Sequence, residues 1–172
     1  REDAAVKAAD AVEALEQKIS WRVANSDIQK LNNNAGKDWV TLSDETLNIL
    51  TQAQSVSEKS GGAFDVTIAP ISRLWDFDDE LNEVPDSDLI TSLLPYVNYS
   101  LLRIDKTEQT ASLKNLGMAV DLGSVGKGAA CDAAVRAYEE AGAKAAIIAV
   151  GGSVGVYGEK SSGKPWSVAV RD

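Results

Sequence analysis

The sequence predicts an α+β fold, because segments with helical periodicity come early in the chain and segments of strand character cluster late. Apolar residues spaced 3, 4, 3 and 4 apart predict an amphipathic helix over residues 3–19. Ser43 has the character of an N-cap and predicts a second helix, which Gly61 ends. The runs 101–104 and 110–113, with polar residues between them, predict a β-hairpin. This segregation of helices and strands favours α+β over a regularly alternating α/β fold.

Shorter elements fill the remaining sequence, and each rests on a local signal. Serine, aspartate or proline marks a helix start, and β-branched or aromatic runs mark extended segments. The expected elements are a helix capped by Ser26 and Gln29 and running through Leu31, an extended piece at 39–41, a helix after Pro70, an acidic solvated loop over 76–85, a helix capped by Asp86 or Ser87 and ending near Pro95, and a hairpin of 154–157 with 166–170.

Composition limits the classes of function. The 172 residues are long enough for one domain over 1–172 with a sizeable core. A net charge of −9, from 26 acidic and 17 basic residues, argues against nucleic acid as a partner. The chain contains no histidine, which removes the commonest general base and transition-metal ligand. Its one cysteine, Cys131, lies among alanines of a predicted helix and is expected to be a buried, inert thiol.

The most informative stretch is 118–128, which predicts a short buried strand followed by a glycine-broken turn. A helix over 129–141, capped by Gly142, and a strand over 145–150 come next. Backbone amides that glycine leaves accessible at a helix N-terminus favour an anionic ligand such as a phosphate. The spacing matches neither the Walker phosphate loop nor the dinucleotide fingerprint. A generic anion loop and a glycine-rich connector without a ligand therefore both fit.

Polar residues near this turn have two interpretations each. Asp121 fits a ligand contact or part of a hard-cation site, and it equally fits a cap for the turn. Lys127 fits a phosphate contact or an ordinary solvated lysine. In the segment 63–67, Phe64 offers an apolar plate and Asp65 a polar group. On periodicity alone, that segment is a short strand with one buried face.

Taken together, several segments resemble the ApbE family of FAD:protein FMN transferases. Each motif is weak alone, but the set occurs in the family's order and spacing over nearly the whole chain. The segments are Ser26-Asp-Ile-Gln-Lys-Leu-Asn32, Ser60-Gly-Gly-Ala-Phe-Asp-Val-Thr-Ile-Ala-Pro70, Leu74-Trp-Asp-Phe77, Ala119-Val-Asp-Leu-Gly-Ser-Val-Gly-Lys-Gly128, Ala149-Val-Gly-Gly-Ser153 and Pro165-Trp166.

The resemblance implies an α+β fold related to the T-fold, with a mixed or antiparallel sheet and flanking helices. It implies an enzyme that cleaves the FAD pyrophosphate with Mg²⁺, attaches FMN through a phosphoester to a threonine or serine of a target flavoprotein, and releases AMP. Motif matching gives the following site: Ala63, Phe64, Asp65, Asp121 and Lys127 for FAD, and Ser124 for the metal. The position around Trp21 and Arg22 matches another flavin contact only loosely.

The resemblance also carries expectations about the whole protein. Family members have an N-terminal strand and a C-terminal third that this chain lacks, so we expect part of a catalytic domain that is inactive by itself. Bacterial family members act on the extracytoplasmic side of the membrane, commonly lipid-anchored, and their targets belong to membrane redox complexes. Three alternatives stay open: an FAD pyrophosphatase that yields FMN and AMP, a non-catalytic FAD-binding protein, and a structural domain without a ligand.

Overall fold

The computed structural model describes residues 2–75 and 83–169. Its chain forms two compact units: a central unit, Gln17–Ser124, and a terminal unit, Arg1–Glu16 with Val125–Asp172. In chain order the elements are α1 (Glu2–Ile19), α2 (Asp27–Asn33), β1 (Val40–Thr41), α3 (Asp44–Lys59), α4 (Ala69–Ser72), α5 (Ser87–Leu93), the 3₁₀ helices η1 (Leu94–Tyr96) and η2 (Tyr99–Leu101), β2 (Leu102–Asp105), β3 (Thr110–Leu113), α6 (Gly123–Glu140), β4 (Ala145–Val150) and β5 (Ser153–Gly158).

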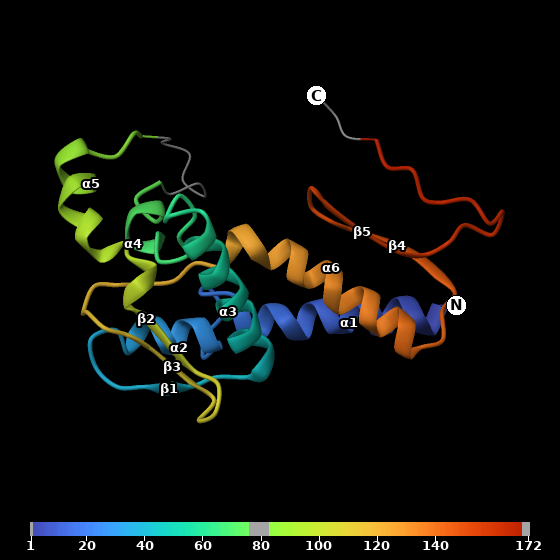
Figure 1. Cartoon of the computed structure of the whole chain (residues 1–172), viewed down its shortest axis with the longest axis horizontal. Coiled ribbons are helices and arrows are strands. Elements are labelled where there is room, and N and C mark those ends of the chain that lie inside the picture. The colour runs from blue at the N-terminus through green and yellow to red at the C-terminus, as the bar shows by residue number, and fades with distance from the viewer. Residues whose placement is uncertain (1, 76–82, 170–172) are drawn as a thin grey trace. The chain divides into compact units, whose positions relative to one another are not determined.

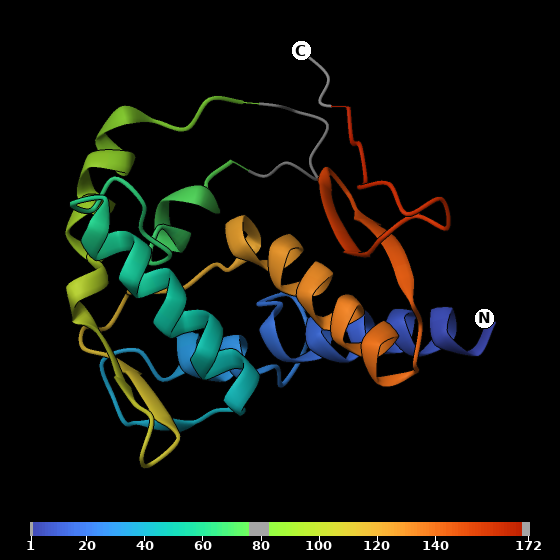
Figure 2. The same ribbon diagram turned by 45° about the vertical axis from the view of Figure 1, so that its right-hand side comes forward.

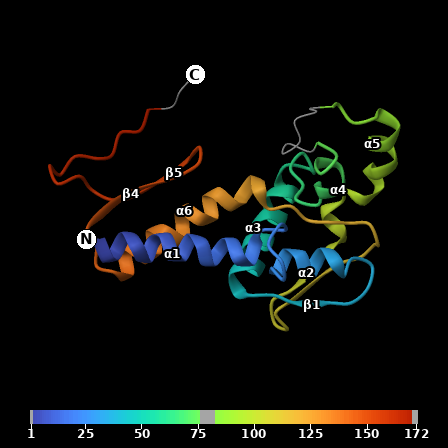
Figure 3. The same ribbon diagram turned by 180° about the vertical axis from the view of Figure 1, so that it is seen from behind.

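The central unit is built around an antiparallel sheet of order β1-β3-β2. Helix α2 packs against β1 and β3, and α3 packs against β2 (Figures 1 and 3). Fully buried side chains from both helices and the sheet form the core, among them Ile28, Leu31, Leu50, Leu102 and Leu113. The predicted hairpin and the α+β class are both confirmed. A single domain over residues 1–172 stays a prediction.

The predicted helix starts are confirmed where a side chain caps the first turn. Ser26 accepts a hydrogen bond from the Gln29 amide, while the Gln29 side chain accepts one from the Asn25 amide. This differs from a capping box, in which the glutamine would reach the N-cap residue itself. Ser43 caps α3 and Asp86 caps α5. Of the acidic loop expected over 76–85, residues 76–82 lie outside the described residues, and 83–85 have no regular structure.

Two predicted strands are wrong. Residues 63–67 form turns rather than a strand, and 118–120 make only an isolated parallel bridge, between Ile68 and Ala119. The apolar residues that suggested strands are nevertheless buried, because Val66 and Val120 lie in the core. Burial alone therefore produced the strand-like pattern in both segments.

The terminal unit contains most of a helix that is longer than predicted, and a different hairpin from the predicted one. Helix α6 already begins at Gly123, so the glycines expected to break a turn lie inside its first turns. Its C-terminus is as predicted: Gly142 has a φ of +73°, and the amides of Gly142 and Ala143 donate to Glu139 and Tyr138 in a Schellman motif. The pairing of 154–157 with 166–170 is wrong, because β5 pairs with β4 through the two-residue turn Gly151-Gly152.

The β4–β5 hairpin lies along α6 (Figure 2). Gly155 is the point of close approach, since a Cβ built there would lie 3.1 Å from the Cβ of Cys131. Cys131 is buried and unpaired, as expected. Among residues 2–75 and 83–169, no helix has the length and apolar character that crossing a membrane requires.

Candidate functional site

The two segments singled out in the sequence lie next to each other in the central unit. The Asp121 amide donates a 2.9 Å hydrogen bond to the Val66 carbonyl oxygen, and the bridge between Ile68 and Ala119 extends the same contact. Segments more than 50 residues apart along the chain thus run side by side. Their contact places Asp121 beside the turn that contains Asp65.

In the described part of the chain, only one oxygen of the Asp121 carboxylate accepts a hydrogen bond. Oδ1 accepts a 2.8 Å hydrogen bond from the Gly123 amide at the start of α6, so the capping role considered from the sequence is real. Among the described residues, no hydrogen bond to Oδ2 is found. Asp121 is half-buried, so Oδ2 is the part of this side chain that remains for a ligand.

Two arginines of the central unit lie over one aromatic ring, and the charge of Asp121 acts on one of them, Arg73. The Arg73 guanidinium carbon is 4.3 Å from the centre of the Trp21 ring, and that of Arg22 is 5.0 Å from the same centre. Burial of the guanidinium away from water lowers the pKa of Arg73 from its ordinary value, and the negative charge of Asp121 opposes that shift. Sequence reasoning missed Arg73, since no spacing or motif in the chain marks it.

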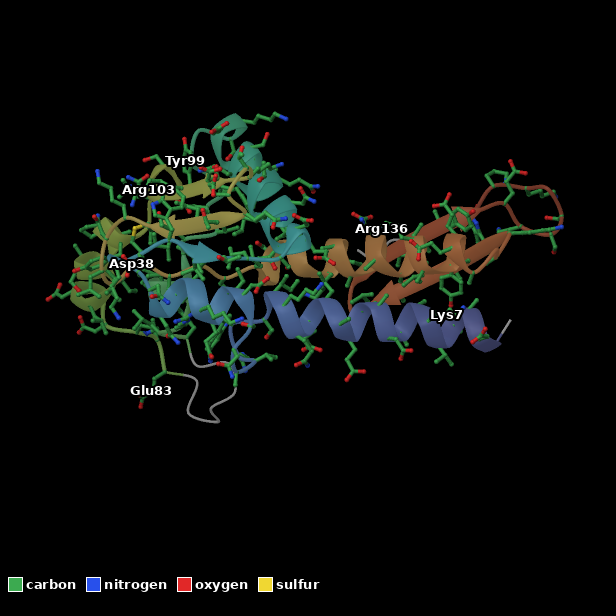
Figure 4. All side chains as sticks on the ribbon, turned by 90° about the horizontal axis from the view of Figure 1, so that it is seen from below. Lys7, Asp38, Glu83, Tyr99, Arg103 and Arg136 are labelled. Carbon is green, nitrogen blue, oxygen red and sulfur yellow. The ribbon has the colours of Figure 1, made fainter. Side chains whose placement is uncertain are left out.

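Asp65 is tied into the fold by both of its oxygens. Oδ1 accepts hydrogen bonds from the Thr67 amide and hydroxyl, at 2.8 and 2.7 Å, and Oδ2 accepts one from the Tyr99 amide at 2.8 Å. Thr67 in turn accepts a bond from the Asn98 amide. Figure 4 labels Tyr99, which lies just before the strand that carries Arg103. The structure therefore shows an internal brace at Asp65, and its contact with FAD stays a prediction.

The remaining predicted residues are more exposed. Ala63 is exposed and Phe64 half-buried, with the Phe64 amide donating to the Ser60 hydroxyl at 3.1 Å. Ser124 is exposed in the first turn of α6. Lys127 belongs to the terminal unit, where its side chain passes over Gly151: a Cβ built on Gly151 would lie 3.2 Å from its Cε.

A metal centre is not assembled within the described part of the chain. There, no three His, Cys, Asp or Glu side chains are grouped closely enough to hold an ion. Mg²⁺ prefers near-octahedral oxygen coordination and commonly keeps several waters and substrate oxygens. The open oxygen of Asp121 and the hydroxyl of Ser124 are the right kind of donor, but two such groups do not make a protein site by themselves.

Comparison with known proteins decides the family. The sequence pattern of the ApbE family matches residues 2–172. The chain belongs to the ApbE family. The FAD:protein FMN transferase of Escherichia coli (strain K12) is 27% identical over 164 residues, covering 93% of this chain and 47% of that protein. That of Salmonella typhimurium (strain LT2) is 31% identical over 134 residues, covering 76% of this chain and 38% of that protein.

Solved structures agree with this assignment. The ApbE protein of Thermotoga maritima superposes with a TM-score of 0.91 and 26% identity, covering 99% of this chain and 56% of that one. The fold is thus the mixed helix-and-sheet fold of ApbE proteins. The chain spans about half the length of the relatives that it matches, with 47% of the E. coli protein covered.

Proposed function

We propose that the protein carrying this chain is an FAD:protein FMN transferase. The observation that supports this proposal is the ApbE match from residue 2 to residue 172, together with relatives of that name. In the proposed reaction, a threonine or serine hydroxyl oxygen of the target flavoprotein bonds to the phosphorus on the FMN side of FAD. The bond from that phosphorus to the bridging oxygen breaks, AMP leaves with that oxygen, and the hydroxyl proton passes to a base.

Residues of the central unit supply most of the proposed flavin contacts. Asp121 offers its open Oδ2 to the ligand while Oδ1 holds the start of α6. Ala63 and Phe64 sit on the turn that Asp65 braces, so the brace fixes where these contacts are presented. Lys127, which belongs to the terminal unit, stays a predicted contact for the diphosphate, as a point charge. Cleavage of a diphosphate depends mainly on positioning and on neutralising charge, which suits a site of this composition.

The described residues limit what can be proposed about Mg²⁺. The described residues alone do not fit a magnesium site, so we route no step through the ion. Ser124 as a ligand stays a prediction that requires oxygen donors beyond those described here. When bound, Mg²⁺ would neutralise charge on the diphosphate.

The proposed partner is a target flavoprotein, taken to belong to a membrane redox complex. The extracytoplasmic side of the bacterial membrane, with a lipid anchor, is proposed for its location. Both proposals derive from the family resemblance. Fractionation of cells that produce the tagged protein tests the location, and recovery in the cytosolic fraction would contradict it.

The enzymatic proposal is tested with FAD, Mg²⁺ and an acceptor protein. We expect a fluorescent acceptor band that survives denaturing electrophoresis, with AMP released in equal amount. Asp121→Asn keeps an oxygen for the Gly123 amide and removes the negative charge, so it should lose the band. Asp38→Asn, which changes an exposed carboxylate of the same unit, is the matched control and should keep it.

Other results separate the alternatives. FMN and AMP without a labelled protein indicate a pyrophosphatase. FAD that binds and stays intact in the presence of Mg²⁺ indicates a non-catalytic flavin-binding protein. A melting temperature that FAD leaves unchanged argues for a domain without this ligand, because a ligand that binds the native state must stabilise it.

A further inference from the structure

The side chain of Asn32 pairs with the backbone of a residue 88 positions away. Its Nδ2 donates to the Val120 carbonyl oxygen at 3.0 Å, and its Oδ1 accepts from the Val120 amide at 2.7 Å. One carboxamide thus satisfies both polar backbone groups of one residue. Val120 is fully buried, so without Asn32 these two groups would lose their partners away from water.

The side chain of Asn32 makes the backbone hydrogen bonds to Val120 that a neighbouring strand would otherwise make. In extended backbone, the polar groups of successive residues point to opposite edges. Ala119 and Asp121 use one edge, through the bridge to Ile68 and the hydrogen bond to Val66. Val120 uses the other edge, where Asn32 meets it. The short segment that ends at Asp121 is therefore fixed on both edges although it belongs to no sheet.

Asn32 is itself held by a well-anchored helix. It lies near the C-terminal end of α2, whose Ile28 and Leu31 are fully buried. At the other end of α2, the Asp27 carboxylate accepts hydrogen bonds from Ser43 at the start of α3. The core of the central unit thus sets the position of the Asn32 side-chain amide. Through its two hydrogen bonds, that amide in turn fixes the position of the Val120 backbone.

We propose that Asn32 is a positioning residue for Asp121, an inference that rests on the proposed role of Asp121 in binding FAD. Asn32 fixes the plane of the peptide group directly before Asp121, and the Gly123 amide fixes Oδ1 after it. Oδ2 is then aimed by the backbone on one side and by the α6 turn on the other. Asparagine is required because aspartate would set an oxygen against the Val120 carbonyl oxygen, and an apolar side chain would pair with neither group.

The positioning itself is tested without any ligand. Amide hydrogen exchange is compared between Asn32→Ala and the control Asn33→Ala, which changes the neighbouring, exposed asparagine of α2. We expect exchange at Val120 and Asp121 to accelerate about tenfold or more in Asn32→Ala alone, with Leu50 in the core of α3 unchanged. Unchanged exchange at Val120 and Asp121 would overturn the inference. If Asn32→Ala does not fold, Asn32→Asp replaces it, since it retains an acceptor for the Val120 amide.

The functional part is tested with a double-mutant cycle on FAD affinity, at a temperature at which every variant is folded. We expect Asn32→Ala to weaken FAD binding about tenfold in the otherwise unsubstituted protein and less than about twofold in the Asp121→Asn variant. Equal losses in both backgrounds would show that Asn32 acts on the fold in general and would overturn the inference. If the unsubstituted protein binds no FAD, the proposed function is refuted, and hydrogen exchange alone then decides whether Asn32 positions Asp121.

Discussion

Replacing Asp65 by asparagine tests whether this carboxylate braces the fold. Oδ1 accepts two hydrogen bonds from Thr67 and Oδ2 accepts one from the Tyr99 amide. Asparagine has only one oxygen, so in either orientation its NH₂ group meets a donor. With the oxygen toward Thr67, the Tyr99 amide loses its partner. The substitution therefore removes one charge-assisted hydrogen bond and weakens the other two.

The expected loss of stability is moderate. A hydrogen bond to a charged group contributes about 1.5–3 kcal/mol, and Asp65 is only half-buried, which favours the lower end. We expect Asp65→Asn to lower the free energy of unfolding by about 2 kcal/mol. Asp65→Ala, which removes all three bonds, should lower it by about 3–4 kcal/mol, because such losses are not additive.

The assay is urea denaturation in the absence of FAD, followed by tryptophan fluorescence, since the chain has four tryptophans. Asp38→Asn is the control, and an exposed substitution of this kind should change stability by less than about 0.5 kcal/mol. If Asp65→Asn is as stable as the control but binds FAD more weakly, then Asp65 serves the ligand and the bracing argument is refuted.

Two further predictions concern the central unit. Burial raises the pKa of Asp27, but hydrogen bonds from Ser43 and Thr46 outweigh it and hold that pKa below its ordinary value. This contribution to stability is complete above the unfolded pKa of about 3.9 and is lost as pH falls through the folded pKa. The difference in unfolding free energy between the unsubstituted chain and Asp27→Asn should therefore shrink below about pH 4. Urea titrations that show a constant difference would contradict this prediction. Gly36→Ala should lower the free energy of unfolding by about 2 kcal/mol or more, and the melting temperature by several degrees. The reason is that φ of Gly36 is +73° and the new Cβ would overlap the backbone nitrogen of Leu116. An unchanged melting temperature in a calorimetric scan would count against this.

Local chemistry made part of the fold predictable. Ser26 and Ser43 cap helices because their hydroxyls lie three residues before an amide that needs an acceptor, and three residues of sequence contain that information. Gly142 ends α6 because the left-handed conformation costs glycine nothing. The β2–β3 hairpin was equally readable, since its two strands are joined by a short polar turn.

Long-range pairing was not predictable in the same way. Residues 118–120 have the composition of a strand, yet their partners are a side chain 88 positions earlier and a turn at 66–68. Arg73 was missed for a related reason, because only the fold brings it to Trp21 and Asp121. The pairing of β5 with β4, in contrast, was missed although its signal is local, since the two glycines that join these strands are typical of a two-residue hairpin turn.

The two aspartates of the matched motifs therefore differ in how much of each remains for chemistry. Both oxygens of Asp65 accept hydrogen bonds, from Thr67 and Tyr99, whereas Asp121 accepts one at Oδ1 from Gly123 and none at Oδ2 from any described residue. A negative charge that already accepts three hydrogen bonds gains little from a new ligand, while a half-satisfied one still gains a full bond. Asp121 should consequently dominate ligand binding and Asp65 should dominate stability. In urea denaturation, Asp65→Asn should lose more stability than Asp121→Asn. In FAD binding, Asp121→Asn should lose more affinity than Asp65→Asn.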